Sequence, residues 1–116
     1  MAIERIDSGS RMSQAAVVGN LVFTAGRVAQ ANAGRDVGAQ TREILEGIEA
    51  LLAKAGTDKS RIVSVNIWLA AISDFDAMNA VYDAWVDKAN PPVRACVEAR
   101  LAGSEFAVEI AAIAER

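Results

Sequence analysis

Three side chains that could take part in binding or catalysis lie close together in the last third of the chain: an arginine, a thiol and a carboxylate. Arg94 and Cys96 fall in the alternating run 93–101, and Glu109 falls in a second alternating run, 106–114. A short glycine-containing segment joins the runs, which predicts a β-hairpin. Because side chains alternate between the faces of a strand, this pairing would bring all three groups to one face. A fixed cation beside a carboxylate and a thiol suits a small-molecule site.

Each of these groups also has a purely structural interpretation. Arg94 could hold a ligand carboxylate with its planar fork, or form a cross-strand ion pair with Glu109 or Glu98. Spacing alone favours the ion pair. Glu109 could position a water molecule and move a proton, or be a paired charge at an interface. Cys96 is typical of a small packing residue rather than a nucleophile, since no histidine is available to activate it.

Composition excludes several kinds of chemistry. The chain contains no histidine, which removes most zinc sites, the serine and cysteine triads and the usual general base near neutral pH. Its formal net charge is −3 at pH 7, with the basic residues scattered. This argues against a nucleic-acid surface. No apolar run approaches the roughly 18 residues of a membrane span. The single cysteine and the lack of a recognisable signal peptide predict a cytoplasmic location.

Turn signals and periodicity predict a single α+β domain over residues 1–116, with the order β-β-α-β-α-β-β. Strands are expected at 14–18 and 21–25, around a Gly-Asn turn, and at 61–69. Residues 2–6 are a candidate edge strand, and 7–12 are expected to form a loop.

Two helices complete the predicted fold. Asp36 is expected to cap a helix over 37–55 that stops at Gly56. The segment Ser73–Asp76 resembles a capping box and is expected to open a second helix that runs to about Lys88.

Two amphipathic helices need one sheet face to cover. The residues expected beneath them are Val63, Val65, Ile67, Val93, Val97, Phe106, Val108 and Ile110. The opposite face is expected to mix the apolar Trp68, Ile62 and Ile113 with the polar Ser64, Asn66, Arg94, Glu98 and Glu109. Such a face is too apolar for open water and too charged for a dry core. It predicts an oligomer in which these faces pack together and leave polar clefts between subunits.

Three ordered segments resemble the RidA family, also called YjgF or, in older usage, endoribonuclease L-PSP. They are Gly19–Gly26, Asp74–Trp85, and Pro92–Glu98 followed by Val108-Glu109-Ile110. Their spacing matches the family along nearly the whole chain, and the half from Ser60 onward is similar to the YoaB-like branch.

The resemblance implies a chorismate-mutase-like fold and a homotrimer with three ligand clefts at subunit interfaces. It also implies hydrolysis of reactive enamines and imines, such as 2-aminoacrylate and its imine, to 2-keto acids and ammonia. No metal or organic cofactor would take part. The partners would be a small 2-imino or 2-keto acid and further copies of the chain, with no nucleic acid and no membrane.

The resemblance also assigns roles to residues of this chain. Arg94 corresponds to a carboxylate-binding arginine, and Glu109 to a glutamate that orients the attacking water. Cys96 and Asn79 correspond to pocket residues. Gly26 corresponds to a position whose backbone N–H faces the ligand.

Two positions depart from the family pattern. Ala25 stands where archetypal members have a serine, and Met12 stands about where they have a pocket tyrosine. Both changes remove hydroxyl groups. The leading hypothesis is an enamine/imine deaminase, and the alternative is a non-catalytic binding protein for small carboxylate metabolites. A ribonuclease, as older descriptions of relatives have it, is opposed by the acidic net charge and the missing histidine.

Overall fold

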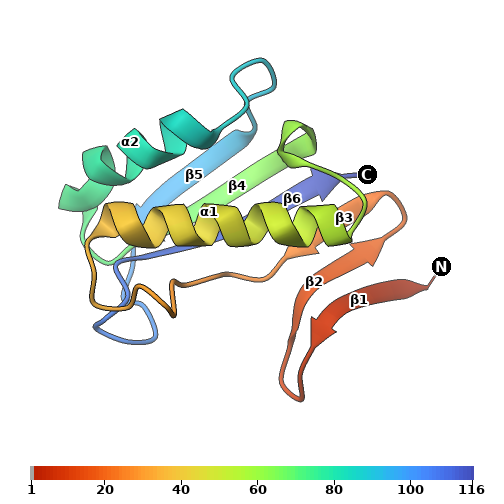
Figure 1. The fold of residues 1–116 in the computed structure, drawn as a ribbon, viewed down its shortest axis with the longest axis horizontal. Coiled ribbons are helices and arrows are strands. Elements are labelled where there is room, and N and C mark those ends of the chain that lie inside the picture. The colour runs from red at the N-terminus through yellow and green to blue at the C-terminus, as the bar shows by residue number, and fades with distance from the viewer. Residues whose placement is uncertain (1) are drawn as a thin grey trace.

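The computed structural model describes residues 2–116 as one mixed sheet covered by two helices (Figure 1). The strands are β1 (Ile3–Ser8), β2 (Ser13–Val18), β3 (Leu21–Thr24), β4 (Ile62–Leu69), β5 (Val93–Glu98) and β6 (Val108–Glu115). The helices are α1 (Val37–Lys54) and α2 (Phe75–Trp85). The strands lie in the order β1-β2-β3-β6-β4-β5. The predicted α+β architecture is confirmed, with the candidate edge strand present as β1.

The first three strands form an antiparallel meander. The β2–β3 hairpin turns at Gly19, whose φ of 60° is the conformation that such a two-residue turn requires. β1 runs to Ser8, further than expected, because Ser8 still pairs with Ser13 across the bend. The expected loop is therefore reduced to a short turn.

α1 begins and ends where its signals are. The Asp36 carboxylate accepts a hydrogen bond from the N–H of Ala39 at 2.9 Å, which caps the first turn. Gly56, with φ of 84°, follows the last turn. The apolar residues that face the sheet are buried, among them Ile44, Ile48 and Leu52.

α2 departs from the prediction at both ends. No side chain caps its N-terminus, so the expected capping box is absent; a 3-10 turn, Ile72–Asp74, runs directly into the helix. The backbone supplies the missing partner, because the N–H of Phe75 donates to the carbonyl of Ile72. At the other end the helix stops at Trp85, since Val86 is extended. Lys59 donates to the Trp85 carbonyl at 2.7 Å.

The predicted hairpin between the last two strands is wrong. β4 lies between them: β5 pairs with β4 in parallel, and β6 pairs with β4 on its other side in antiparallel fashion. The crossover through α2 explains the difference, because a strand that returns after a helix pairs in parallel with the strand before it. Residues 99–107 connect β5 to β6 across the end of β4, so they do not form a tight hairpin turn.

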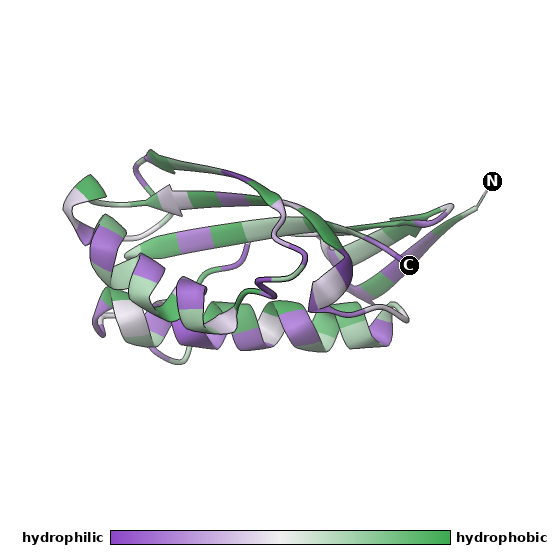
Figure 2. Ribbon diagram, turned by 90° about the horizontal axis from the view of Figure 1, so that it is seen from above, coloured by the Kyte–Doolittle hydropathy of each residue, from purple (hydrophilic) through white to green (hydrophobic). Residues whose placement is uncertain are grey.

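Both helices cover one face of the sheet, and no element within residues 2–116 covers the other, which we call the open face (Figure 2). Val65, Ile67 and Leu69 of β4 lie beneath the helices and are fully buried. Val108 and Ile110 of β6 share that core. The open face is left with partly exposed apolar side chains.

The prediction of which residues lie under the helices is also wrong for all of β5 and for Val63 of β4. Val63, Val93 and Val97 were expected there but are 49%, 69% and 50% exposed. Arg94 and Glu98, expected on the opposite face, stand beside the buried Val65 and Leu69 and therefore face the helices. Val65, Ile67, Val108 and Ile110 lie beneath the helices as expected. Ile62 was expected on the opposite face but is buried in the core as well. β5 is an edge strand, like β1 at the other side of the sheet, and α2 is the helix whose side chains reach it.

Neither helix in the described part of the chain is long and apolar enough to cross a membrane.

Candidate functional site

Arg94 is held between β5 and α2. Its Nη1 donates to Oδ1 of Asn79 at 2.7 Å. Its guanidinium carbon lies 4.7 Å from the ring centre of Tyr82 and 5.8 Å from that of Phe75. Cations over aromatic rings at these distances are attracted to the electron-rich face. The side chain therefore has a fixed direction before any ligand arrives.

The local sequence of α2 explains this arrangement. Phe75, Asn79 and Tyr82 are spaced by four and then three residues, so they share one helical face. Arg94 reaches that face because its strand neighbour Val65 points the same way, into the core. Asn79 was expected near the ligand, and the structure gives it the role of fixing Arg94. Phe75 and Tyr82 were not among the expected site residues, although their spacing from Asn79 carries the signal.

Cys96 lies on the same side of β5, half-buried against the core. Burial raises the pKa of its thiol, and the charge of Arg94 opposes that rise. Burial likewise raises the pKa of the Tyr82 hydroxyl. Both groups are therefore neutral near pH 7. This agrees with a pocket-lining thiol rather than a nucleophile.

Glu109 lies in a second place, against Gly26. Arg27, which follows Gly26, pairs with Ile110 through two backbone hydrogen bonds. The Arg27 N–H donates to the Ile110 carbonyl at 2.9 Å, and the Ile110 N–H donates to the Arg27 carbonyl at 3.1 Å. These bonds hold Gly26 over the Glu109 side chain so closely that a Cβ at position 26 would collide with Oε2. A larger residue at position 26 would therefore push the Glu109 carboxylate out of this place.

The backbone N–H of Gly26 finds no acceptor among residues 2–116, and Gly26 is exposed. The neighbouring N–H groups are bonded: that of Ala25 donates to Gln14 at 2.8 Å, and that of Arg27 to Ile110. A free N–H beside a carboxylate can bind a ligand oxygen. The resemblance assigns ligand contact to this N–H, and that role stays a prediction.

Met12 and Gly26 line a hollow of about 490 Å³ at the end of β2, together with Asp7, Gln14, Arg27, Val28 and Gln30. The Met12 side chain is 47% exposed. Ala25 is half-buried next to Gly26 and contributes no side-chain hydrogen-bonding group. Arg27 and Gln14 are residues of this hollow that the sequence interpretation missed.

Arg94 and Glu109 do not meet within one chain, contrary to the prediction. In β4, Val65 is the neighbour of Arg94 and Trp68 is the neighbour of Glu109. Positions three apart on a strand face opposite ways. Arg94 therefore faces the helices, and Glu109 faces the open side. The chain carries two partial sites: the Arg94 half-site (Arg94, Asn79 and Cys96) and the Glu109 half-site (Glu109, Gly26, Ala25 and Met12).

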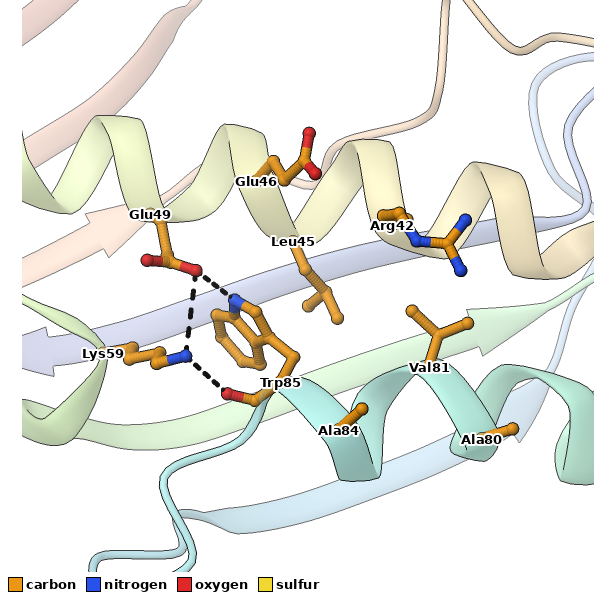
Figure 3. A pocket seen from close by; sticks show the side chains of 9 residues that line it. All are labelled: Arg42, Leu45, Glu46, Glu49, Lys59, Ala80, Val81, Ala84 and Trp85. Atoms are coloured by element: carbon orange, nitrogen blue, oxygen red, sulfur yellow. Dashed lines mark hydrogen bonds and ion pairs between the residues drawn. The ribbon is translucent and has the colours of Figure 1, made fainter.

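A further groove of about 450 Å³ runs between α1 and α2 (Figure 3). Leu45, Val81 and Ala84 line it together with polar residues, of which Glu49, Lys59 and Trp85 bond to one another. The Trp85 indole N–H donates to Glu49 at 2.5 Å, and Lys59 lies 4.0 Å from the same carboxylate. The groove shares no lining residue with either half-site.

The comparisons with known proteins agree on the family. A profile described as endoribonuclease L-PSP matches residues 2–116. The RutC family protein YoaB of Escherichia coli is 39% identical over 114 residues, which cover 98% of each chain. The 2-iminobutanoate/2-iminopropanoate deaminase of Escherichia coli is 31% identical over 105 residues, which cover 85% of this chain and 82% of the other.

The fold comparison points the same way. The crystal structure of NMB1025, a member of the YjgF protein family from Neisseria meningitidis, has a TM-score of 0.96 and 37% identity, and the match covers 100% of this chain and 96% of that chain. The resemblance found in the sequence, including the similarity to YoaB, is confirmed, and the chain belongs to the RidA/YjgF family, whose profile carries the description endoribonuclease L-PSP.

Proposed function

We propose that this protein hydrolyses small 2-imino acids to 2-keto acids and ammonia at a site built from two copies of the chain. The observation that carries the proposal is the guanidinium of Arg94, which Asn79 and two aromatic rings fix without any carboxylate partner among the described residues. A relative with 31% identity bears the name 2-iminobutanoate/2-iminopropanoate deaminase, which supports the same chemistry.

Arg94 would bind the carboxylate of the imino acid. A guanidinium carries five N–H donors, and the bond to Asn79 occupies one nitrogen. The remaining donors can form the paired hydrogen bonds that a planar carboxylate accepts. This interaction would place the C=N carbon at a fixed distance from the guanidinium.

Glu109 would direct the attacking water. The water oxygen forms a bond to the C=N carbon, and the π electrons move to nitrogen. Glu109 accepts a proton from the water and delivers it to that nitrogen, which gives a carbinolamine. Glu109 then passes the hydroxyl proton of the carbinolamine to the nitrogen, an oxygen electron pair forms the C=O bond, and the C–N bond breaks with its electrons on the leaving ammonia, so that the keto acid remains. The free N–H of Gly26, next to Glu109, would hold a substrate or water oxygen during these steps.

The two half-sites require a second subunit. Within one chain their key groups face opposite sides of the sheet, so a ligand that touches both must lie between copies. The open face offers the contact surface, because Phe23, Val93 and Val97 expose large apolar side chains there. In the homotrimer that we propose, each of the three interfaces would hold one Arg94 half-site and one Glu109 half-site.

The test couples an amino-acid oxidase, which produces the imine, to a semicarbazide trap for imine that has not been hydrolysed. The wild-type protein should lower the amount of imine captured by the trap and raise the rate at which keto acid is released. Arg94→Ala should lose about 10- to 100-fold in rate, the size expected for a charge-assisted hydrogen-bonded pair. Arg42→Ala, an exposed arginine on α1, is the matched control and should behave as wild type. Keto-acid release no faster than in buffer would reject the proposal.

A non-catalytic carboxylate-binding protein is the second candidate. It is favoured by Ala25 and Met12, which leave the Glu109 half-site without the hydroxyl groups of archetypal relatives. Calorimetry with pyruvate and 2-ketobutyrate separates the two functions. Binding that Arg94→Ala abolishes, with no imine hydrolysis, would assign this function in place of the enzyme.

A further inference from the structure

The pairing of β6 with β3 and the residues that follow β3 is irregular next to the Glu109 half-site. The ladder ends at the pair of Phe23 and Ile113, and pairing resumes between Arg27 and Ile110. Residues 24–26 therefore stand opposite only residues 111–112 of β6. An extra residue on one strand makes a β-bulge, a feature found often beside active sites, where it redirects side chains or ends the pairing.

The hydroxyl of Thr24 fills this break with two hydrogen bonds. It accepts a proton from the N–H of Ala112 at 2.9 Å, a bond that a backbone carbonyl would accept in a regular ladder. It donates its own proton to the carbonyl of Ala25 at 3.1 Å. No backbone N–H among residues 2–116 bonds to that carbonyl. The half-buried Thr24 side chain thus ties the Ala25 carbonyl to β6.

The Ala25 carbonyl and the Gly26 N–H belong to one peptide unit. This unit is planar and trans, so the two groups point in opposite directions. Because Thr24 holds the carbonyl, the direction of the Gly26 N–H is fixed too, and it points away from the Thr24 hydroxyl. The peptide units on both sides are held by backbone hydrogen bonds of their own.

The Gly26 N–H lies within reach of an oxygen atom that Glu109 can also bind. A Cβ at position 26 would collide with Oε2 of Glu109, so the amide nitrogen, which is bonded to the same Cα, lies within about 5 Å of Oε2. Since a hydrogen bond spans about 2.7–3.0 Å, one oxygen atom can bond to two groups at this separation. The N–H has no acceptor among residues 2–116, and Gly26 is exposed.

We infer that Thr24 is a positioning residue: through the Ala25 carbonyl it aims the Gly26 N–H at the oxygen atom that attacks the C=N carbon. This inference rests on the proposed function and adds a residue to it. The oxygen belongs first to water, then to the hydroxyl of the carbinolamine, and finally to the carbonyl of the keto acid. The N–H would stabilise it most when Glu109 removes the hydroxyl proton and negative charge gathers on the oxygen.

The first test is kinetic and uses the imine assay. Thr24→Val removes the hydroxyl and keeps the shape of the side chain. It should lower kcat about 10- to 100-fold and change KM less than about threefold, because the donor acts on the oxygen as its charge develops. Thr24→Ser keeps a hydroxyl and should retain most of the activity.

The matched control is Thr41→Val, the same change at a buried threonine of α1 outside both half-sites. The Thr41 hydroxyl donates to the Val37 carbonyl at 2.7 Å, so this variant also loses a hydrogen bond to the backbone. It should lower the melting temperature and leave kcat and KM unchanged. An equal loss of kcat in Thr24→Val and Thr41→Val would mean that Thr24 acts only through stability, and would overturn the inference.

Nuclear magnetic resonance observes the Gly26 amide itself. Its signal should shift on addition of pyruvate, whose keto oxygen is the one that the N–H would bind, and should shift less with propionate, which lacks that oxygen. Thr24→Val should lose the extra shift with pyruvate, and Thr41→Val should keep it. A Gly26 amide that responds equally to both acids in the wild type would overturn the inference, even if Thr24→Val does not fold.

The two readouts separate failure of this inference from failure of the proposed function. If the extra shift with pyruvate depends on Thr24 but no imine is hydrolysed, the positioning role stands and the enzymatic function falls. If Thr24→Val hydrolyses imines as fast as the wild type, the function stands and the positioning role falls.

Discussion

At the scale of single residues, Asn79 decides where Arg94 points. Its side-chain oxygen accepts the Nη1 proton at 2.7 Å. The rings of Phe75 and Tyr82 attract the cation, with centres 5.8 and 4.7 Å from the guanidinium carbon, and add to its positioning. The amide is the neutral acceptor that orients one edge of the fork.

Replacement of Asn79 tests this role. Asn79→Ala should weaken the binding of pyruvate about 10-fold, because a charge-assisted hydrogen bond contributes roughly 1.5–3 kcal/mol and part of it is lost in fixing the guanidinium. Asn79→Asp should weaken it further, since a carboxylate at that position would compete with the ligand for Arg94. Calorimetry measures both, with the exposed Asn90→Ala as control. Unchanged affinity in both variants would contradict the assigned role.

Cys96 gives a prediction that depends on pH. Burial raises the pKa of its thiol, so the reactive thiolate is scarcer at every pH below that pKa than for free cysteine. Modification by iodoacetamide at pH 7 should be slower than for free cysteine and should rise as the pH approaches the raised value. In Arg94→Ala the opposing charge is gone, so the reaction should slow further. Faster modification than free cysteine would show an activated thiol instead.

At the scale of elements, the cap of α1 is the simplest stabilising feature. Asp36→Ala removes the bond to the Ala39 N–H and should lower the free energy of unfolding by about 1 kcal/mol. Chemical denaturation measures the change. Asp83→Ala, an exposed position on α2, provides the comparison and should change stability less. An equal effect at both positions would mean that the loss of charge, not of the cap, is responsible.

The sequence was informative wherever local signals decide the structure. Asp36 and Gly56 mark the ends of the first helix, and Gly19 marks the first hairpin, because capping and positive φ depend on near neighbours. The period of two along β5 also correctly groups Arg94, Cys96 and Glu98 on one face. Alternation singled out Arg94, Cys96 and Glu109, and the family resemblance added Asn79, Gly26, Ala25 and Met12 to the predicted site residues.

The same reasoning failed wherever distant segments choose their partners. Two alternating runs with a short linker predict a hairpin, yet β4 lies between β5 and β6. Nothing in the runs themselves shows that a third strand separates them. The error carried over to the site, because the predicted meeting of Arg94 and Glu109 depended on that pairing. Arg27 was missed for a similar reason: its side chain lies against Gly47, twenty residues away on α1.

At the scale of the whole molecule, the division of the site predicts complementation between inactive variants. Arg94→Ala and Glu109→Gln should each be inactive alone. Unfolded together and refolded as a mixture, they should regain part of the wild-type activity, because some interfaces would combine the intact Arg94 half-site of one copy with the intact Glu109 half-site of another.

Imine hydrolysis in the refolded mixture is the readout, and each variant refolded by itself is the control. A mixture no more active than its components, although hybrid oligomers form, would place both residues in a site within one copy. The composition of the oligomers can be followed by native mass spectrometry of differently tagged chains.

The central place of β6 in the sheet has a consequence for how the protein is made. Among residues 2–116, β6 comes after every other strand in sequence, yet it alone joins the meander β1–β3 to the pair β4 and β5. Until the ribosome has released residues 108–115, the nascent chain holds two separate pieces of sheet with unprotected edges. Folding must therefore wait for the end of translation of this segment, and chaperones that shield exposed strands would act before that moment.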